Sequence, residues 1–148
     1  MRTITITPES EGVTHVKDNL YEWDGGKFTE PTNLTFARGI EIFIPEGQSI
    51  DTGGGDILMT DNLLALRDGS IDLNGGHIKM RAYSRIRITN GNIFLHGSSI
   101  DLADSNIFIR NGRIDLDGGR LLINGHRLID TQIGNFMVGN VNFDEWYP

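Results

Sequence analysis

The chain carries a hydrophobic pattern with a period of seven residues over more than half of its length. From Ser49 onward it divides into twelve units of seven, with one residue, Ser84, left over between the fifth and sixth units. The second position is Ile or Leu in all twelve units, and the fourth is apolar in ten, with Thr52 and Asp130 as exceptions. Apolar positions two residues apart predict a β-strand, since alternate side chains of a strand point to one face.

Turn residues close each unit. The sixth position is Gly, Asn or Asp in ten of the twelve units, and these residues tolerate the left-handed backbone of a tight corner. Units three apart, or 21 residues, carry matching turns. Examples are Asp68-Gly69, Asn90-Gly91 and Asn111-Gly112, and likewise Gly75, Gly97 and Gly118. A repeat of this kind predicts stacked coils.

We therefore predict an all-β fold, a parallel β-helix (β-solenoid) of three-sided coils of about 21 residues, right-handed as such crossovers usually are. The extra residue Ser84 is interpreted as a bulge or a wider corner. Two rival folds share much of the pattern. One is an antiparallel meander, and the other is three interwound chains that each supply one side of every coil.

The period divides the chain into three parts. Residues 1–48 are predicted to form an N-terminal cap, with a strand at 3–7 stopped by Pro8, followed by irregular first coils at 20–26, 33–39 and 41–47. Residues 49–133 form the regular β-helix. Residues 134–148 form a C-terminal cap or a docking tail, which is rich in aromatic side chains: Phe136, Phe143, Trp146 and Tyr147.

Composition narrows the function classes. The net charge is −7, from 13 basic and 20 acidic residues, so no basic stripe is available to neutralise phosphates and nucleic-acid binding is not expected. The chain has no cysteine and therefore no disulfide or thiolate metal site. It contains no apolar run of the ~18 residues that a membrane span needs, and its N-terminus does not resemble a signal peptide.

Candidate chemistry is sparse. The third position points outward, and one face should stack Asp51, Asp72, Phe94 and Asp115. Acids in adjacent coils would lie about 5 Å apart, as in retaining glycosidases, but solvated acids are the favoured interpretation. The four histidines (His15, His77, His96 and His126) fall at corner positions. We predict no enzyme, no metal and no cofactor.

Apolar residues at outward positions indicate contact with other subunits. One row should contain Ala65, Arg87, Phe108 and Ile129, and another should contain Leu58, Lys79, Asp101 and Leu122. With the tail aromatics, the candidate partner contacts are Leu58, Phe94, Phe108, Leu122, Ile129, Phe136, Phe143, Trp146 and Tyr147. A homo-oligomer is therefore expected.

The run IEIFIPEGQSIDTGGGDI at 40–57 resembles the entry into the parallel β-helix of phage tailspikes and the pectate-lyase-like superfamily. The later run SSIDLADSNIFIRNGRIDL resembles the β-repeats of trimeric viral fibre shafts. The resemblance implies a structural virion component (tail spike, fibre or capsid-surface part), assembled in the host cytoplasm as a homotrimer. Its partners would be other virion proteins and cell-surface carbohydrate.

The resemblance has limits. Enzymatic tailspikes have many more coils, and fibre shafts carry a globular head that is not visible in this sequence. Catalytic residues are therefore not carried over. Two alternatives remain open: a bactofilin-like cytoskeletal β-helix that polymerises end to end, and a carbohydrate-binding or cleaving module.

Overall fold

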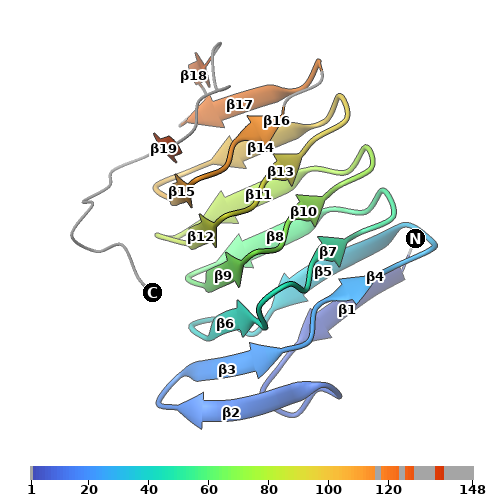
Figure 1. The fold of residues 1–148 in the computed structure, drawn as a ribbon, viewed down its shortest axis with the longest axis vertical. Helices are drawn as coiled ribbons and strands as arrows, with labels where there is room; N and C mark the ends of the chain where they lie inside the picture. The colour runs from blue at the N-terminus through green and yellow to red at the C-terminus, as the bar shows by residue number, and fades with distance from the viewer. Residues whose placement is uncertain (1, 116–117, 124–125, 129–135, 139–148) are drawn as a thin grey trace.

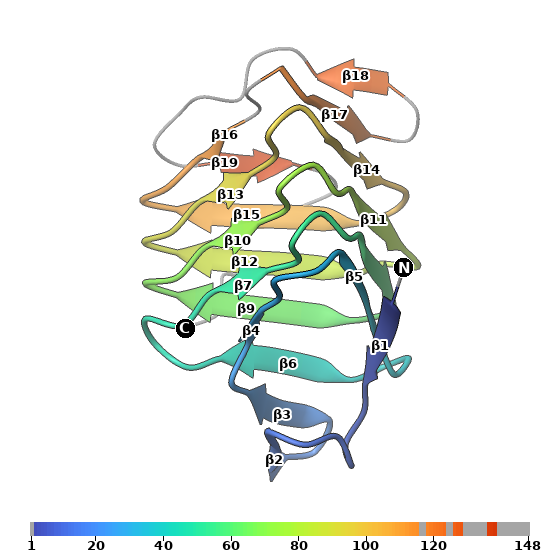
Figure 2. The same ribbon diagram turned by 90° about the vertical axis from the view of Figure 1, so that its right-hand side faces the viewer.

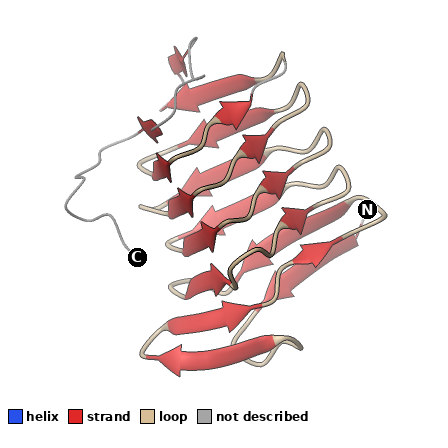
Figure 3. Ribbon diagram, viewed as in Figure 1, coloured by secondary structure: helices blue, strands red, loops and turns tan. Residues whose placement is uncertain are grey.

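The computed structural model describes residues 2–115, 118–123, 126–128 and 136–138, and these residues form strands and turns without a helix (Figures 1 and 3). Three sheets run the length of the molecule. Sheet A contains β1 (Arg2–Ile6), β5 (Thr32–Phe36), β8 (Ile57–Thr60), β11 (Ile78–Arg81), β14 (Ser99–Leu102), β17 (Arg120–Ile123) and β18 (His126–Leu128). Sheet B contains β2 (Val13–Lys17), β3 (Leu20–Trp23), β6 (Glu41–Ile44), β9 (Leu63–Arg67), β12 (Arg85–Thr89), β15 (Asn106–Arg110) and β19 (Phe136–Val138). Sheet C contains β4 (Gly26–Lys27), β7 (Ile50–Asp51), β10 (Ile71–Asp72), β13 (Ile93–Phe94) and β16 (Ile114–Asp115).

The chain visits the sheets in the order B, C, A and repeats this circuit about five times, as Figure 2 shows from the side. Each strand from β3 to β14 pairs in parallel with its counterpart one coil further along. Ile50 pairs with Ile71 and Ile71 with Ile93, steps of 21 and 22 residues. Met59 pairs with Met80, as the period predicts. The predicted β-solenoid is confirmed, and parallel pairing within one chain rules out the antiparallel meander.

The interior is a set of aliphatic columns. Every described residue at the second position of a unit, from Ile50 to Leu121, has no exposed surface. The fourth positions from Thr52 to Ile109 are also buried. They include the polar exception Thr52, whose hydroxyl donates to the carbonyl of Leu73 in the next coil at 3.2 Å. Burial of each such side chain contributes roughly 1.5 to 3 kcal/mol, which explains why the pattern alone specifies the fold.

The corners have the left-handed backbone that their residue types predict. The sixth residue of each of the first ten units has a positive φ, including Asp68 (55°), Asn90 (57°) and Gly97 (87°). Ala82 (55°) is the one member of this set that is not Gly, Asn or Asp, and the next residue, Tyr83, is also left-handed at 63°. This corner is wider than the others.

The extra residue of the repeat is Tyr83 and not Ser84. Ser84 is fully buried and takes the place of Asn62 and Ser105: Arg85 N–H donates to the carbonyl of Asn62, and Asn106 N–H donates to the carbonyl of Ser84. Tyr83 is 74% exposed. The insertion is therefore absorbed by turning one residue outward, and the buried column at this corner stays unbroken.

Both ends depart from the parallel repeat. At the N-terminal end β1 joins sheet A in parallel with β5, while β2 folds back antiparallel on β3. At the other end β18 lies antiparallel on β17, and β19 lies antiparallel on β15. The coil that begins at β4 is longer, since Gly26 pairs with Ile50, a step of 24 residues. Among the described residues no helix is long and apolar enough to cross a membrane.

Candidate functional site: corner ladders and outer faces

A ladder of polar side chains follows the corner between sheets C and A. Asn33 Oδ1 accepts the N–H of Asp56, Asp56 Oδ1 accepts the N–H of His77, and His77 Nδ1 accepts the N–H of Ser99, at 2.9, 2.9 and 3.0 Å. Each side chain thus satisfies a backbone donor one coil further along. Because these donors lie where the strands of sheet A begin, the ladder replaces the backbone pairing that the corner interrupts.

A second ladder follows the corner between sheets B and C. Ser49 Oγ accepts the N–H of Ser70, Ser70 Oγ accepts that of Asn92, and Asn92 Oδ1 accepts that of Arg113, at 3.0 to 3.1 Å. All these residues hold the first position of a unit, which is polar in eleven of the twelve units. This excess of polar residues at the first position was the sequence signal for the ladders, and sequence reasoning missed it.

The predicted row of acids on the outer face of sheet C is present: Asp51 pairs with Asp72, Asp72 with Phe94, and Phe94 with Asp115. The carboxylates are engaged in turns. Asp51 Oδ1 accepts the N–H of Gly53 at 2.9 Å, and Asp72 Oδ1 accepts the N–H of Asn74 at 3.0 Å. These are side-chain bonds to the backbone two residues on, which hold a turn in place.

We expect Asp72→Ala to lower the free energy of unfolding by about 1 kcal/mol, because one turn hydrogen bond is lost. Asp72→Asn should lose much less, since the amide oxygen accepts the same N–H. Urea unfolding midpoints of the two variants measure the difference. Equal losses in both variants would mean that the charge, and with it the His96 contact at 3.2 Å, matters more than the turn.

A shallow groove of about 280 Å³ crosses the outer face of sheet C. Its lining includes Asp51, Asp72 and the half-buried ring of Phe94, with Lys27 at one end. The Phe94 ring stacks against His96, with centroids 6.3 Å apart. An aromatic ring and a lysine therefore stand beside the acids; the sequence pattern placed Phe94 in this row but did not place Lys27 there.

The histidines whose side chains are described are engaged in structural contacts. His15 Nε2 lies 2.9 Å from the carbonyl of Asp18, His77 belongs to the corner ladder, and His96 contacts Asp72. The side chain of His126 lies outside the described set. No group of three or more metal-ligating side chains comes together in the described part of the chain.

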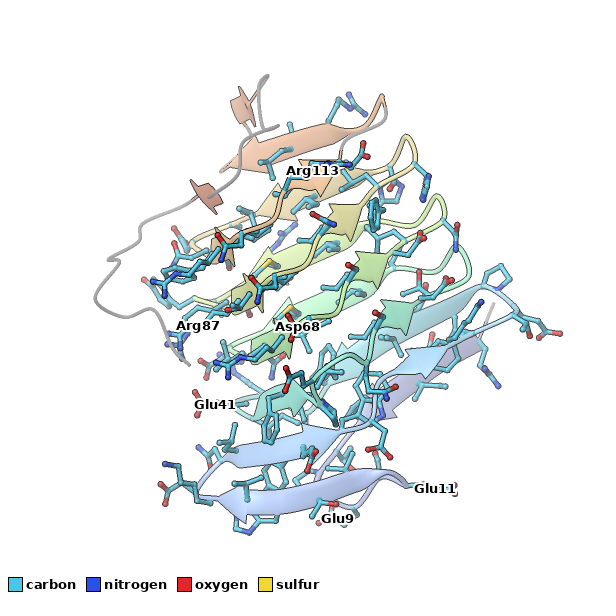
Figure 4. All side chains as sticks on the ribbon, in the orientation of Figure 1. Glu9, Glu11, Glu41, Asp68, Arg87 and Arg113 are labelled. Carbon is cyan, nitrogen blue, oxygen red and sulfur yellow. The ribbon has the colours of Figure 1, made fainter. Side chains whose placement is uncertain are left out.

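The corner between sheets B and C also carries two exposed acids, Glu46 and Asp68 (Asp68 is labelled in Figure 4). The side-chain hydrogen bond to Asp68, followed by its charge, raises the pKa of Glu46. The hydrogen bonds from Glu46 and then Asn90 lower the pKa of Asp68. The two carboxyls therefore share a proton as pH falls and repel each other when both are ionised.

Glu46→Gln should raise the melting temperature at pH 7, because the amide donates to Asp68 at every pH. The raised pKa of Glu46 means that its stabilisation is present when it is protonated and is lost as pH rises through that pKa. The advantage of the variant should therefore shrink toward about pH 4. Glu11→Gln, which removes the same charge from an exposed turn, is the control. An equal gain in the control would attribute the effect to net charge.

The outer face of sheet B differs from the other two. Its central row is Phe43, Ala65, Arg87 and Phe108, joined by parallel register (Figure 4 labels Arg87). Phe43 and Ala65 are half-buried, whereas Arg87 is 5% exposed and Phe108 is fully buried. The Arg87 guanidinium lies over the Phe108 ring, 5.4 Å from its centroid. Phe108 was predicted as a partner contact; it is fully buried within this single chain, and its contact with a partner stays a prediction.

An apolar groove of about 530 Å³ continues this face toward the N-terminal end. It is lined by Val16, Phe43 and Ala65, with the exposed cations Lys17 and Arg67 at its rim and Glu46 nearby. Val16 is 47% exposed. This surface combines aliphatic and aromatic groups with positive charge in a chain that is acidic as a whole.

The outer row of sheet A is mixed. Leu58, Lys79, Asp101 and Leu122 stack in register as predicted, and Asp101 forms an ion pair with Arg81 at 3.0 Å. Leu58 is 43% exposed and Leu122 is half-buried, so both can touch a partner. The exposure of the remaining candidate contacts is not described. Phe136 has a described backbone only, and the others lie outside the described residues: Ile129, Phe143, Trp146 and Tyr147.

Comparison of the chain with models of protein families, with curated proteins and with solved structures finds no match. The class that the geometry defines is the parallel β-solenoid, with three-sided coils and antiparallel strands at its ends.

Proposed function

We propose that this protein is a structural element, not an enzyme: a short, rigid stalk or attachment part of a phage tail spike, fibre or capsid surface. The observation that supports a structural role most directly is the use of its polar side chains. Asp51, Asp56, Asp72 and His77 could serve in chemistry, but each instead holds a turn or a neighbouring coil. The resemblance of 40–57 to tailspike β-helices supports the virion setting.

The ends of the stack favour a discrete part over an end-to-end filament. A coil can add to another coil in parallel only where its strand edge repeats the register of the stack. Antiparallel β2, β18 and β19 interrupt that register in sheets A and B. Such strands blunt edges that would otherwise pair with further copies. This argues against the bactofilin-like alternative.

Light scattering across a dilution series tests the assembly. The proposal expects a constant mass of three chains of 16.5 kDa, with Leu58 and Leu122 of sheet A among the contacts. Growth into long polymers would overturn it in favour of the filament. Leu58→Glu should weaken the trimer. A wild-type monomer would contradict the homotrimer.

Mass spectrometry of purified phage particles tests the virion setting independently. Peptides of this chain should be present in a fixed ratio to the other particle proteins. Their absence from particles whose host cells contain the chain would contradict the proposal.

Carbohydrate contact is a second candidate, favoured by the groove on sheet C, where Phe94 stands beside Asp51 and Asp72. Aromatic rings with nearby polar groups suit sugar binding. Titration with host surface glycan, followed by NMR, should shift the Phe94 and Asp72 resonances, and Phe94→Ala should abolish those shifts. Unchanged spectra at saturating glycan would remove this candidate.

A further inference from the structure

At the corner between sheets A and B, exposed polar side chains take no part in the hydrogen bonding that holds the coils together. At the other two corners, polar side chains such as Asp56 and Ser70 accept backbone N–H groups of the next coil. Here Asn19, Asp61 and Tyr83 are exposed, and their side chains form no hydrogen bond with a described residue. Their polar groups are therefore available to a molecule outside the chain.

The three side chains line a polar recess of about 360 Å³. Its lining also includes Glu41 and Arg85, whose side chains meet in an ion pair at 3.4 Å (Figure 4 labels Glu41). The pair spans two coils, because Leu63 lies between these two residues in the register of sheet B. It engages Nη2 of Arg85, and the remaining guanidinium N–H groups have no acceptor among the described residues. The recess therefore offers both donors and acceptors of hydrogen bonds.

The insertion in the repeat falls at this recess. Tyr83 is the inserted residue, it is 74% exposed, and its backbone is left-handed at φ 63°. The neighbouring Ala82 is also left-handed at 55°. A left-handed backbone is unfavourable for a bulky side chain, and strain of this kind is concentrated at functional sites. An insertion that strains the backbone and turns an aromatic ring outward beside a polar recess indicates a binding site.

The charges of the lining select the class of ligand. The carboxylates of Glu41 and Asp61 would repel an anion, while the Arg85 guanidinium would repel a metal ion or an ammonium group. The carboxylates and the Asn19 carbonyl accept hydrogen bonds, whereas the guanidinium and the Asn19 amide donate them. A neutral ligand that carries several hydroxyl groups satisfies both kinds of partner, because each hydroxyl can donate and accept.

We propose that this recess binds one neutral sugar unit, with the Tyr83 ring packed against the C–H face of the sugar and the carboxylates of Glu41 and Asp61 accepting its hydroxyl groups. A tyrosine ring offers an apolar face for such packing. The volume of the recess lies near the lower end of the range for small-molecule sites, roughly 300 to 1,000 Å³, which suits a single unit. The recess lies at the corner opposite sheet C, so this inference depends neither on the groove beside Phe94 nor on the proposed structural role.

NMR titration tests the site. The probes are the methyl glycosides of glucose, mannose, galactose and N-acetylglucosamine, each added to about 100 mM so that millimolar dissociation constants are detected. At least one of them should shift the backbone amide of Tyr83 and the Nε–H of Arg85 in a saturable way. The amino sugar and the uronic acid related to that probe carry a positive and a negative charge, and both should bind several-fold more weakly. No shift with any neutral probe, or tighter binding of a charged analogue, would overturn the proposal.

Tyr83→Gly separates binding from folding. Glycine adopts the left-handed backbone without strain, so this variant should be at least as stable to heat as the unmodified chain, while its affinity for the sugar falls about tenfold. Tyr83→Asn, which also tolerates this backbone, repeats the test. Unchanged sugar affinity in both variants would contradict the proposal.

Asp61→Asn tests the role of the carboxylate. Asparagine keeps the shape of the side chain and tolerates the left-handed backbone (φ 55°), so the variant should fold and bind the sugar several-fold more weakly. Asp104→Asn is the matched control, because Asp104 is an exposed residue of the same corner (φ 50°) two coils further on and does not line the recess. Equal losses of affinity in the two variants would attribute the effect to net charge and overturn the assignment of Asp61.

Crossed variants distinguish this site from the groove on sheet C. Phe94→Ala changes the lining of that groove and should leave the sugar-induced shifts at Tyr83 intact. Loss of those shifts in Phe94→Ala would assign the binding to sheet C and contradict the proposal. The mass of the assembly and the composition of phage particles do not involve this recess, so failure of the sugar site and failure of the structural role are separate results.

Discussion

Gly91→Ala is expected to lower the free energy of unfolding by about 4 kcal/mol or more, at the extreme of single substitutions. A Cβ at Gly91 would lie 1.8 Å from the carbonyl oxygen of Gly69 in the coil before, and neither backbone can move without breaking the parallel pairing. Gly69 and Gly112 stand in the same column, with Cβ distances of 1.9 and 1.7 Å to the coil beneath. Denaturant unfolding and the β-sheet signal in circular dichroism measure the loss.

Gly75→Ala is the matched control. Gly75 also lies at a corner, but a Cβ there meets nothing within 4 Å, so the cost is limited to its left-handed backbone (φ 98°), about 1 to 2 kcal/mol. If Gly91→Ala cost no more than Gly75→Ala, the coils would not stack as closely as the structure shows.

Asn62→Ala is expected to cost about 1 to 3 kcal/mol, because it removes three hydrogen bonds of a buried amide and leaves the N–H of Thr60 without that acceptor. Asn62 is 3% exposed. Its Oδ1 accepts the N–H of Thr60 at 2.9 Å, and its Nδ2 donates to the carbonyls of Ala37 at 2.8 Å and Ile40 at 3.3 Å. The side chain thus links its own turn to the coil before it.

Asn19→Ala, on an exposed turn, should change the unfolding free energy by less than about 0.5 kcal/mol. Urea unfolding of both variants gives the comparison. A loss below 1 kcal/mol at Asn62 would mean that water takes the place of the amide, and the corner would then be more open than described.

The sequence was enough to predict the solenoid because its decisive positions have one physical use. An Ile or Leu at the second position of every unit has to be buried, and an Asn or Gly at the sixth position favours a left-handed corner. These constraints act within a few residues of each other. The stacking of Asp51 on Asp72 and of Leu58 on Lys79 followed from the period alone.

The polar ladders could not be predicted in the same way. A polar side chain at a first position could equally well face solvent. Only the stacked coils show which backbone N–H is accepted by Ser49, Asp56 or Asn92. The glycines at the seventh position are similar, because a Cβ at Gly69 or Gly91 would meet a carbonyl oxygen of the preceding coil. Without the corner geometry, the period alone pointed to Ser84 as the inserted residue. The structure shows that the inserted residue is Tyr83.

The outer faces show a further limit. Phe94 and Phe108 occupy the same position of their units, yet Phe94 lines an open groove and Phe108 is buried. A repeat pattern reports which side of a strand a residue is on, and it carries no information on what lies over that side. Strand β2 was missed for a related reason: it lies outside the repeat, and its residues are mostly exposed.

The central claim is that one chain closes every coil by itself, and a methyl NOE between Ile71 and Ile93 tests it most directly. These side chains are fully buried and stack in adjacent coils. Chains with labelled isoleucine methyl groups are refolded with an excess of unlabelled chains, and Ile93→Val assigns the cross-peak. A closed single-chain coil predicts that the NOE between labelled methyl groups keeps its full intensity per labelled chain. Loss of that NOE on mixing, with new NOEs between labelled and unlabelled chains, would show interwound chains and contradict the account.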